Sequence, residues 1–279
     1  MSSKLIVVGD SYCMNYIKMR NQTHLENKEP YLLYVDDNAI EMEWQYKKEF
    51  KLWPEIVAQY YDLDLINLSE SGAGNYSIFS MALDSIVTMK PKKLIVVWSG
   101  WDRFDFEADE VQMKIRLISN SKIIKNNYSL KPKNNTRTAW IRYHGIQTAN
   151  NKKYNTNCLD EIKEVGAFNI SASINMFMRL TYSLQEICKS LNIDLTMFQS
   201  VRPFALASDN EIAAKKIISD PYIDKIDDNV FKGFPTLSYI GGKCFSDILH
   251  TRDFRFRISE HDGHPNEKGN EEIAKYVVS

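Results

Sequence analysis

The sequence lacks closely spaced cysteines, an excess of either charge and a long hydrophobic run. Its four cysteines form no Cys-x-x-Cys pair, which argues against a disulfide framework and against a zinc site. The 35 Lys and Arg residues nearly balance the 36 Asp and Glu residues, so nucleic acid is not an expected partner. We expect all four cysteines to be reduced thiols: Cys13, Cys158, Cys188 and Cys244.

The first hydrophobic segment is too short to cross a membrane. It runs from Lys4 to Val8 and meets Gly9 and Asp10 without the small-residue cleavage site of a secretory signal. We therefore expect a cytoplasmic protein with no membrane span.

Four short apolar runs, each followed by turn residues, predict strands buried on both faces, as in a parallel sheet covered by helices. Helical spacing of apolar residues predicts helices between and after these runs. The predicted strands are Lys4–Val8, Leu63–Leu68, Lys93–Trp98 and Ile193–Phe198, and the predicted helices are Glu55–Tyr61, Asn75–Met89, Ser173–Leu191 and Glu267–Val277.

This alternation predicts an α/β fold with three layers, a doubly wound parallel sheet between helices. The length of 279 residues is compatible with a single domain, 1–279. Two stretches, 105–166 and 202–257, break the alternation and are expected to be insertions that act as lids, partner surfaces or mobile segments.

Polar residues follow the carboxyl ends of the predicted strands, where open parallel sheets bind ligands. Serine, glycine, aspartate and histidine at one edge are what acyl transfer requires: a nucleophile, a base with an orienting carboxylate, and close backbone N–H groups for an oxyanion. The segments are Gly9–Ser11, Ser71–Asn75 and Ser99–Arg103, with His261–Asn266 added from the last loop.

These segments resemble the motifs of the SGNH (GDSL-type) hydrolases. Ile6–Ser11 is similar to their strand followed by Gly-Asp-Ser, Asn67–Gly72 to their second block, and Asp262–Gly269 to their last block. The resemblance implies a flavodoxin-like sheet, Ser11 as nucleophile, His264 as base and no metal or other cofactor. It also implies Asp262 as the residue that orients the base, with the N–H groups of Ser11 and Gly72 as oxyanion donors.

The third block departs from the family pattern. The family usually has Gly-x-Asn-Asp, whose asparagine donates to the oxyanion, but here Asp102 stands in its place. A carboxylate there repels an oxyanion unless it is protonated or turned away, and loss of such a donor costs on the order of 10²–10³ in rate. Gly74 or Asn75 is the expected substitute donor. Glu260 is an alternative to Asp262 as the orienting acid, because the spacing to the histidine is shorter than usual.

Four residues near the predicted site are assigned to substrate binding: Asp10, Trp101, Asp102 and Arg103. Trp101 would either stack on a sugar or acyl group or pack inside. Arg103 would either pair with Asp102 or bind an anionic substrate.

Several weaker interpretations concern single motifs. The segment that begins at Gly72 invites a dinucleotide site, but it lacks the third glycine and the acidic residue after the next strand. Cys13 is either a thiol nucleophile or a small buried residue. His24, His144 and His250 show no metal-ligand spacing, and His261 is expected to be a solvated neighbour.

Two functions follow. The first is a serine esterase or deacylase, with an O-acetylated carbohydrate as the favoured ester because of Trp101, Arg103 and the polar insertions. The second is a catalytically weak SGNH-like module that binds a glycan or a protein, motivated by Asp102. The Lys- and Asn-rich composition resembles phage proteins, which would make a virion component an option. The oligomeric state is left open.

Overall fold

A computed structural model of the chain describes residues 3–14, 32–35, 38–41, 50–109, 138–144, 169–250, 254–258 and 262–279. For Phe104 and for strand residues 32–35, 38–41, 106–109 and 138–144, it describes the backbone alone. The predictions for His24, Cys158, Glu260 and His261, and for most of 105–166, fall outside this part of the chain.

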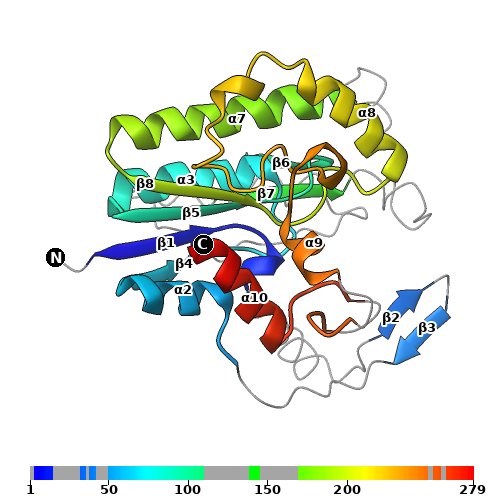
Figure 1. Cartoon of the computed structure of the whole chain (residues 1–279), viewed down its shortest axis with the longest axis horizontal. Helices are drawn as coiled ribbons and strands as arrows, with labels where there is room; N and C mark the ends of the chain where they lie inside the picture. The colour runs from blue at the N-terminus through cyan, green and yellow to red at the C-terminus, as the bar shows by residue number, and fades with distance from the viewer. Residues whose placement is uncertain are drawn as a thin grey trace.

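The main sheet has four parallel strands in the order β4-β1-β5-β8, as Figure 1 shows. The first strand in sequence lies between the second and third of this sheet, which is the flavodoxin-like doubly wound arrangement. The predicted fold class is therefore confirmed, and the predicted strands agree with the observed ones to within one residue. The strands are β1 (Lys4–Val8), β4 (Asp64–Asn67), β5 (Lys93–Trp98) and β8 (Asp194–Gln199).

Helices cover both faces of this sheet (Figure 1), because alternate side chains of each strand pack on opposite faces. In β1, Ile6 and Val8 belong to one buried cluster, whereas Leu5 and Val7 belong to the other. The first cluster is closed by α3 (Asn75–Met89), α7 (Ile170–Ser190) and α8 (Ala207–Ile218). The second is closed by α2 (Trp53–Tyr61), α9 (Phe245–Leu249) and α10 (Glu267–Val278).

Residues that favour the start of a helix lie at the N-termini of α2 and α10. Pro54 lies in the first turn of α2, where its missing N–H has no consequence, and Glu55 Oε2 accepts a 2.7 Å hydrogen bond from the Leu52 N–H. Asn266 caps α10, because its Oδ1 accepts from the Gly269 N–H at 3.0 Å. All four predicted helices are present.

The second predicted insertion, 202–257, contributes residues to the core. Ala213 and Ile217 of α8 are buried in the first cluster. Beside β8, the Met197 N–H donates to Val230 O at 2.7 Å and the Lys232 N–H donates to Met197 O at 3.0 Å, so this segment extends the sheet edge. The expectation of a lid or partner surface is wrong for these residues. The apolar runs in this segment are too short and too irregularly spaced to be recognised from the sequence as part of a sheet edge.

Two antiparallel strand pairs outside the main sheet were not predicted. β2 (Leu32–Val35) pairs with β3 (Asn38–Glu41), and β6 (Arg103–Asp109) pairs with β7 (Thr138–His144). β6 begins at Arg103, the last residue of the polar segment that follows β5, and both β6 and β7 contribute residues to the first predicted insertion, 105–166. Within the described residues, no helix is both long enough and apolar enough to cross a membrane.

Candidate active site

The turn that carries Ser11 follows directly after β1. Residues Ser11–Cys13 form one 3-10 turn, η1, and Asp10 caps it by accepting from the Tyr12 N–H at 3.1 Å. The indole N–H of Trp53 donates to Tyr12 O at 3.0 Å, and the Asn67 amide donates to Cys13 O at 2.7 Å. Three separate side chains thus fix the backbone of this turn.

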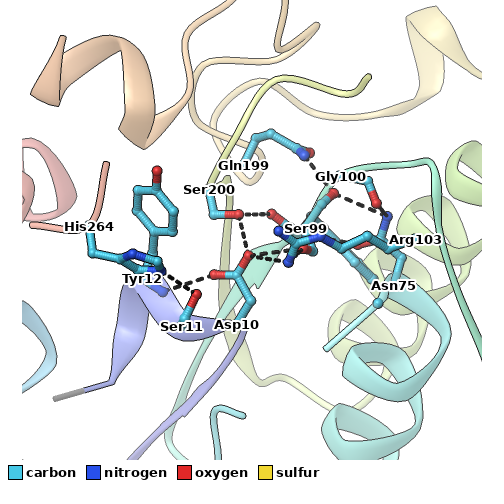
Figure 2. A network of polar contacts seen from close by, with 12 residues as sticks. Asp10, Ser11, Tyr12, Asn75, Ser99, Gly100, Arg103, Gln199, Ser200 and His264 are labelled. Carbon is cyan, nitrogen blue, oxygen red and sulfur yellow. Dashed lines mark hydrogen bonds and ion pairs between the residues drawn. The ribbon is translucent and has the colours of Figure 1, made fainter. Parts of the chain in front are cut away.

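Ser11, His264 and Asp262 lie in one hydrogen-bonded line. His264 Nε2 is 2.7 Å from Ser11 Oγ (Figure 2), and His264 Nδ1 is 2.6 Å from Asp262 Oδ1. The same Asp262 oxygen accepts from the His264 backbone N–H at 3.0 Å. Ser11 and Asp262 are each 6 % exposed, while the His264 side chain is 19 % exposed. This is the geometry that a base needs in order to take a proton from a hydroxyl.

The loop that carries His264 is held by backbone contacts to residues 254–258. His264 O accepts from the Ile258 N–H at 2.9 Å, and the Asn266 N–H donates to Phe256 O at 3.1 Å. Gly269 packs directly against the same Phe256 carbonyl, and a side chain at this position would overlap it. The glycine therefore allows α10 to approach the loop closely.

The aromatic ring of Tyr12 lies beside the histidine, with ring centroids 5.3 Å apart and an interplanar angle of 38°. Burial raises the pKa of the Tyr12 hydroxyl above its ordinary value, and the nearby Asp10 adds to the increase. The phenol is therefore neutral and packs against one side of the imidazole. No role was predicted for Tyr12.

A buried carboxylate lies immediately before the serine. Asp10 is 0 % exposed, and its Oδ2 accepts from Ser200 Oγ at 2.7 Å, from Ser99 Oγ at 2.9 Å and from Arg103 Nη1 at 3.3 Å (Figure 2). Arg103 Nη1 also donates to Ser99 Oγ at 2.6 Å. A carboxylate this buried has no room for a substrate, so the assignment of Asp10 to substrate binding is wrong.

The same contacts revise the prediction for Arg103. Arg103 forms an ion pair with Asp10 instead of with its chain neighbour Asp102, and its side chain is 22 % exposed. A buried charge needs a partner and further hydrogen bonds, and Arg103, Ser99 and Ser200 supply them. Sequence reasoning placed Ser99 at this edge without a role and gave none to Ser200, although each follows directly after a strand of the sheet.

The two first-choice oxyanion donors are the backbone N–H groups of Ser11 and Gly72. Gly72 has φ of +73°, in the left-handed region that favours glycine. It ends the tight turn that follows β4. Their role as oxyanion donors stays a prediction.

Gly74, a predicted substitute oxyanion donor, lies against the Asp105 carboxylate instead of open space. A side chain at Gly74 would overlap the Asp105 carboxylate, whose Oδ2 accepts from the Ser77 N–H at 3.2 Å. Asp105 thus occupies the N-terminus of α3, and its negative charge opposes a second anion there. This charge disfavours a dinucleotide phosphate at the N-terminus of α3, whereas the role of Gly74 as an oxyanion donor stays a prediction.

Asn75 is the second predicted substitute donor, and its side-chain amide makes its hydrogen bonds within the protein. Its Oδ1 accepts from the Ser99 N–H at 2.8 Å, and its Nδ2 donates to Ser99 O at 3.2 Å and to Gly100 O at 3.3 Å. The side chain is 0 % exposed. The Asn75 side chain fixes the loop after β5 and has no N–H left for an oxyanion, whereas a role for the Asn75 backbone stays a prediction.

Asp102 folds back over its own turn. Its Oδ1 packs against Gly100, and its carboxylate accepts a hydrogen bond from the Ala205 backbone. Burial raises the pKa of Asp102 above its ordinary value, while Arg103 opposes that shift. Asp102 is therefore engaged by the neighbouring loop at Ala205, and its assignment to substrate binding stays a prediction.

Trp101 is a core residue. It is 0 % exposed and stacks on Phe177 with centroids 4.1 Å apart, while Phe204 contacts it edge-on. Its indole N–H donates to Gln199 Oε1 at 3.2 Å. The alternative that Trp101 stacks on a substrate is wrong, because both ring faces and the N–H are committed inside the protein.

The environment of Cys13 disfavours the alternative of a thiol nucleophile. Cys13 is 0 % exposed, and burial raises its thiol pKa, which disfavours the thiolate that a cysteine nucleophile needs. Among the described residues, no group of three or more His, Cys, Asp or Glu side chains could hold a metal ion.

No protein-family model matches the chain, and no curated protein matches it. Solved structures similar to it include a putative lipolytic protein of the G-D-S-L family from Desulfitobacterium hafniense DCB-2, with 13 % identity and a TM-score of 0.45 over 99 % of this chain and 97 % of that one. Another is the psychrotrophic esterase EstA from Pseudoalteromonas sp., with 11 % identity, a TM-score of 0.39 and coverage of 99 % and 94 %. A third is the acetylxylan esterase Axe2 from Geobacillus stearothermophilus, with 9 % identity, a TM-score of 0.41 and coverage of 100 % and 94 %. The functional argument below rests on the contacts of the site itself.

Proposed function

We propose that the protein is a serine hydrolase that cleaves an ester through an acyl-enzyme on Ser11. The observation that carries the proposal is the position of the His264 ring, with Nε2 at 2.7 Å from Ser11 Oγ and Nδ1 at 2.6 Å from Asp262 Oδ1. One imidazole thus contacts a hydroxyl and a buried carboxylate through its two nitrogens, as general-base activation of a serine requires.

In the acylation step, the Ser11 hydroxyl proton passes to His264 Nε2 while Oγ bonds to the ester carbonyl carbon. Asp262 accepts from Nδ1–H, which selects the tautomer with a free Nε2 and stabilises the imidazolium that forms. The backbone N–H groups of Ser11 and Gly72 receive the oxyanion. His264 then returns the proton to the departing alkoxide, and the alcohol leaves.

In the deacylation step, His264 takes a proton from water, whose oxygen attacks the acyl carbon. Collapse of the second tetrahedral intermediate breaks the bond to Ser11 Oγ, which recovers its proton from His264. The carboxylic acid is released and the enzyme returns to its starting state.

The proposal extends to the ester bond and not to a particular alcohol. The preference for an O-acetylated carbohydrate depended partly on Trp101, which is buried, and on Arg103, which pairs with Asp10.

The test is hydrolysis of aryl acetate and aryl butyrate by the purified protein beside its Ser11→Ala variant. The proposal predicts turnover by the first and none above background by the second, with the same melting temperature for both. Equal rates in the two proteins, or no turnover by either, would contradict the proposal and favour the alternative of a binding module for a glycan or a protein.

A further inference from the structure

A chain of buried hydrogen bonds joins the serine turn to the histidine loop. The Trp53 indole N–H donates to Tyr12 O at 3.0 Å, and the Trp53 backbone N–H donates to Asn270 Oδ1 at 2.9 Å. The Asn270 amide then donates to Asn266 O at 2.9 Å and to Pro265 O at 3.4 Å. The chain thus begins one residue after Ser11 and ends one residue after His264.

Both central residues lie on helices, which makes the connection stiff. Trp53 is the first residue of α2 and Asn270 is in α10, and these two helices pack on the same face of the sheet. Trp53 is 0 % exposed and Asn270 is 1 % exposed. Trp53 also packs edge-on against Phe245, at 5.6 Å between ring centroids.

Such a connection is needed because the two reacting side chains come from distant parts of the chain. Ser11 and His264 are separated by 253 positions, and both lie outside the strands and long helices. A misplacement of about 1 Å between catalytic groups costs on the order of 10²-fold in rate. Sites of this kind are held by a supporting layer of packed and hydrogen-bonded side chains.

We infer that Trp53 and Asn270 are positioning residues that hold His264 at hydrogen-bond distance from Ser11. This inference rests on the proposed function. It adds that catalysis depends on a contact between α2 and α10 that no substrate touches. The pair acts through the backbone of Tyr12 on one side and of Pro265 and Asn266 on the other.

The decisive variant is Asn270→Asp, which keeps the size of the side chain and an oxygen facing the Trp53 N–H. It loses the N–H donors to Pro265 and Asn266 and places a carboxylate against their carbonyls. We expect kcat to fall by about 10–100-fold, with KM unchanged, because the histidine is displaced but the substrate surface is not.

The matched control is Gln185→Glu, the same amide-to-acid change in a buried helix position. Gln185 lies in α7, on the opposite face of the sheet. Its Oε1 accepts from the Asp227 N–H at 2.8 Å, and its Nε2 donates to Lys225 O at 3.0 Å. This variant is expected to lower the melting temperature without lowering kcat. Equal kcat losses in the two variants, or none in Asn270→Asp, would overturn the inference.

Trp53→Phe provides a second variant in case Asn270→Asp does not fold. It keeps an aromatic ring against Phe245 and removes the indole N–H that reaches Tyr12 O. The expected result is again a lower kcat at unchanged KM. A kcat equal to that of the wild type would contradict the inference.

A readout without turnover separates the inference from the proposed function. The His264–Asp262 hydrogen bond of 2.6 Å should give a strongly downfield proton resonance, assigned by its loss in His264→Ala. This resonance is expected to persist in Gln185→Glu and to broaden or shift in Asn270→Asp. An unchanged resonance in Asn270→Asp overturns the inference whether or not the wild type hydrolyses esters, whereas failure of the proposed function is a wild type that hydrolyses none.

Discussion

Arg103 Nη1 lies 3.3 Å from Asp10 Oδ2, a fully buried carboxylate in the residue before Ser11. Because Ser99 and Ser200 donate to the same oxygen, this one atom joins the carboxyl ends of β1, β5 and β8. The Asp10 side chain thus fixes the edge of the sheet from which Ser11 projects, and its charge depends on Arg103 for compensation.

Removal of Arg103 should therefore destabilise the fold. Arg103→Met leaves the Asp10 carboxylate buried without its cation, and we expect a loss of about 3 kcal/mol in the free energy of unfolding, measured by urea denaturation. Lys275→Met, which breaks the exposed ion pair with Glu272, is the control and should unfold at nearly the same urea concentration as the wild type. Equal midpoints for both variants would contradict the role given to Arg103.

Asp262→Asn should leave the fold intact and remove most of the activity. An asparagine amide facing His264 Nδ1 favours the tautomer with its proton on Nε2, which cannot take the Ser11 proton. We expect kcat for aryl acetate to fall by about 10⁴-fold. A loss of less than tenfold would show that Asp262 does not orient the base.

Asp102→Asn should stabilise the protein at neutral pH. Because burial raises the pKa of Asp102 in the folded state, the charged form costs stability above that pKa. The cost vanishes once the pH falls below 3.8, the ordinary value, where the acid is protonated in both states. The variant should therefore have the higher melting temperature at pH 7, and the difference should shrink as the pH is lowered. A difference that grows on acidification would contradict this sign.

Trp101→Ala should act on stability and not on substrate affinity. Truncation of a fully buried tryptophan stacked on Phe177 typically costs about 3–5 kcal/mol. Trp101→Phe retains part of that packing, and its KM for aryl esters should equal that of the wild type. Tyr60→Ala, at a residue 65 % exposed, is the stability control. A raised KM in Trp101→Phe at unchanged stability would restore the substrate-binding interpretation.

The strands of the sheet were predictable because each is a short run rich in apolar residues; β1, β5 and β8 are largely buried, whereas the edge strand β4 is only partly buried. Leu5–Val8 needs no long-range information to be recognised as such a strand. The proximity of Ser11, Asp262 and His264 was expected from the resemblance to the SGNH hydrolases, since Ser11 alone of the three follows a strand of the sheet. Gly72 was expected in the turn after β4. Its positive φ, which glycine tolerates, was not foreseeable from the sequence.

The polar partners at that edge were not predictable, because they depend on where side chains point. Asp10, Trp101 and Asn75 were assigned to a substrate or an oxyanion on proximity alone, and all three turn inward. Arg103 was expected beside its sequence neighbour Asp102, but the β6 strand that it begins directs it to Asp10. Sequence spacing shows at which edge of the sheet a residue lies. Side-chain packing decides whether that residue points into the protein or towards a ligand.

The most direct test of the central claim is covalent labelling with an aryl fluorophosphonate, followed by peptide mass mapping. If His264 activates Ser11, the wild type should gain one phosphonyl group, located on Ser11, and Ser11→Ala and His264→Ala should gain none under the same conditions. Labelling of the wild type at another residue, or equal labelling of His264→Ala, would contradict the account.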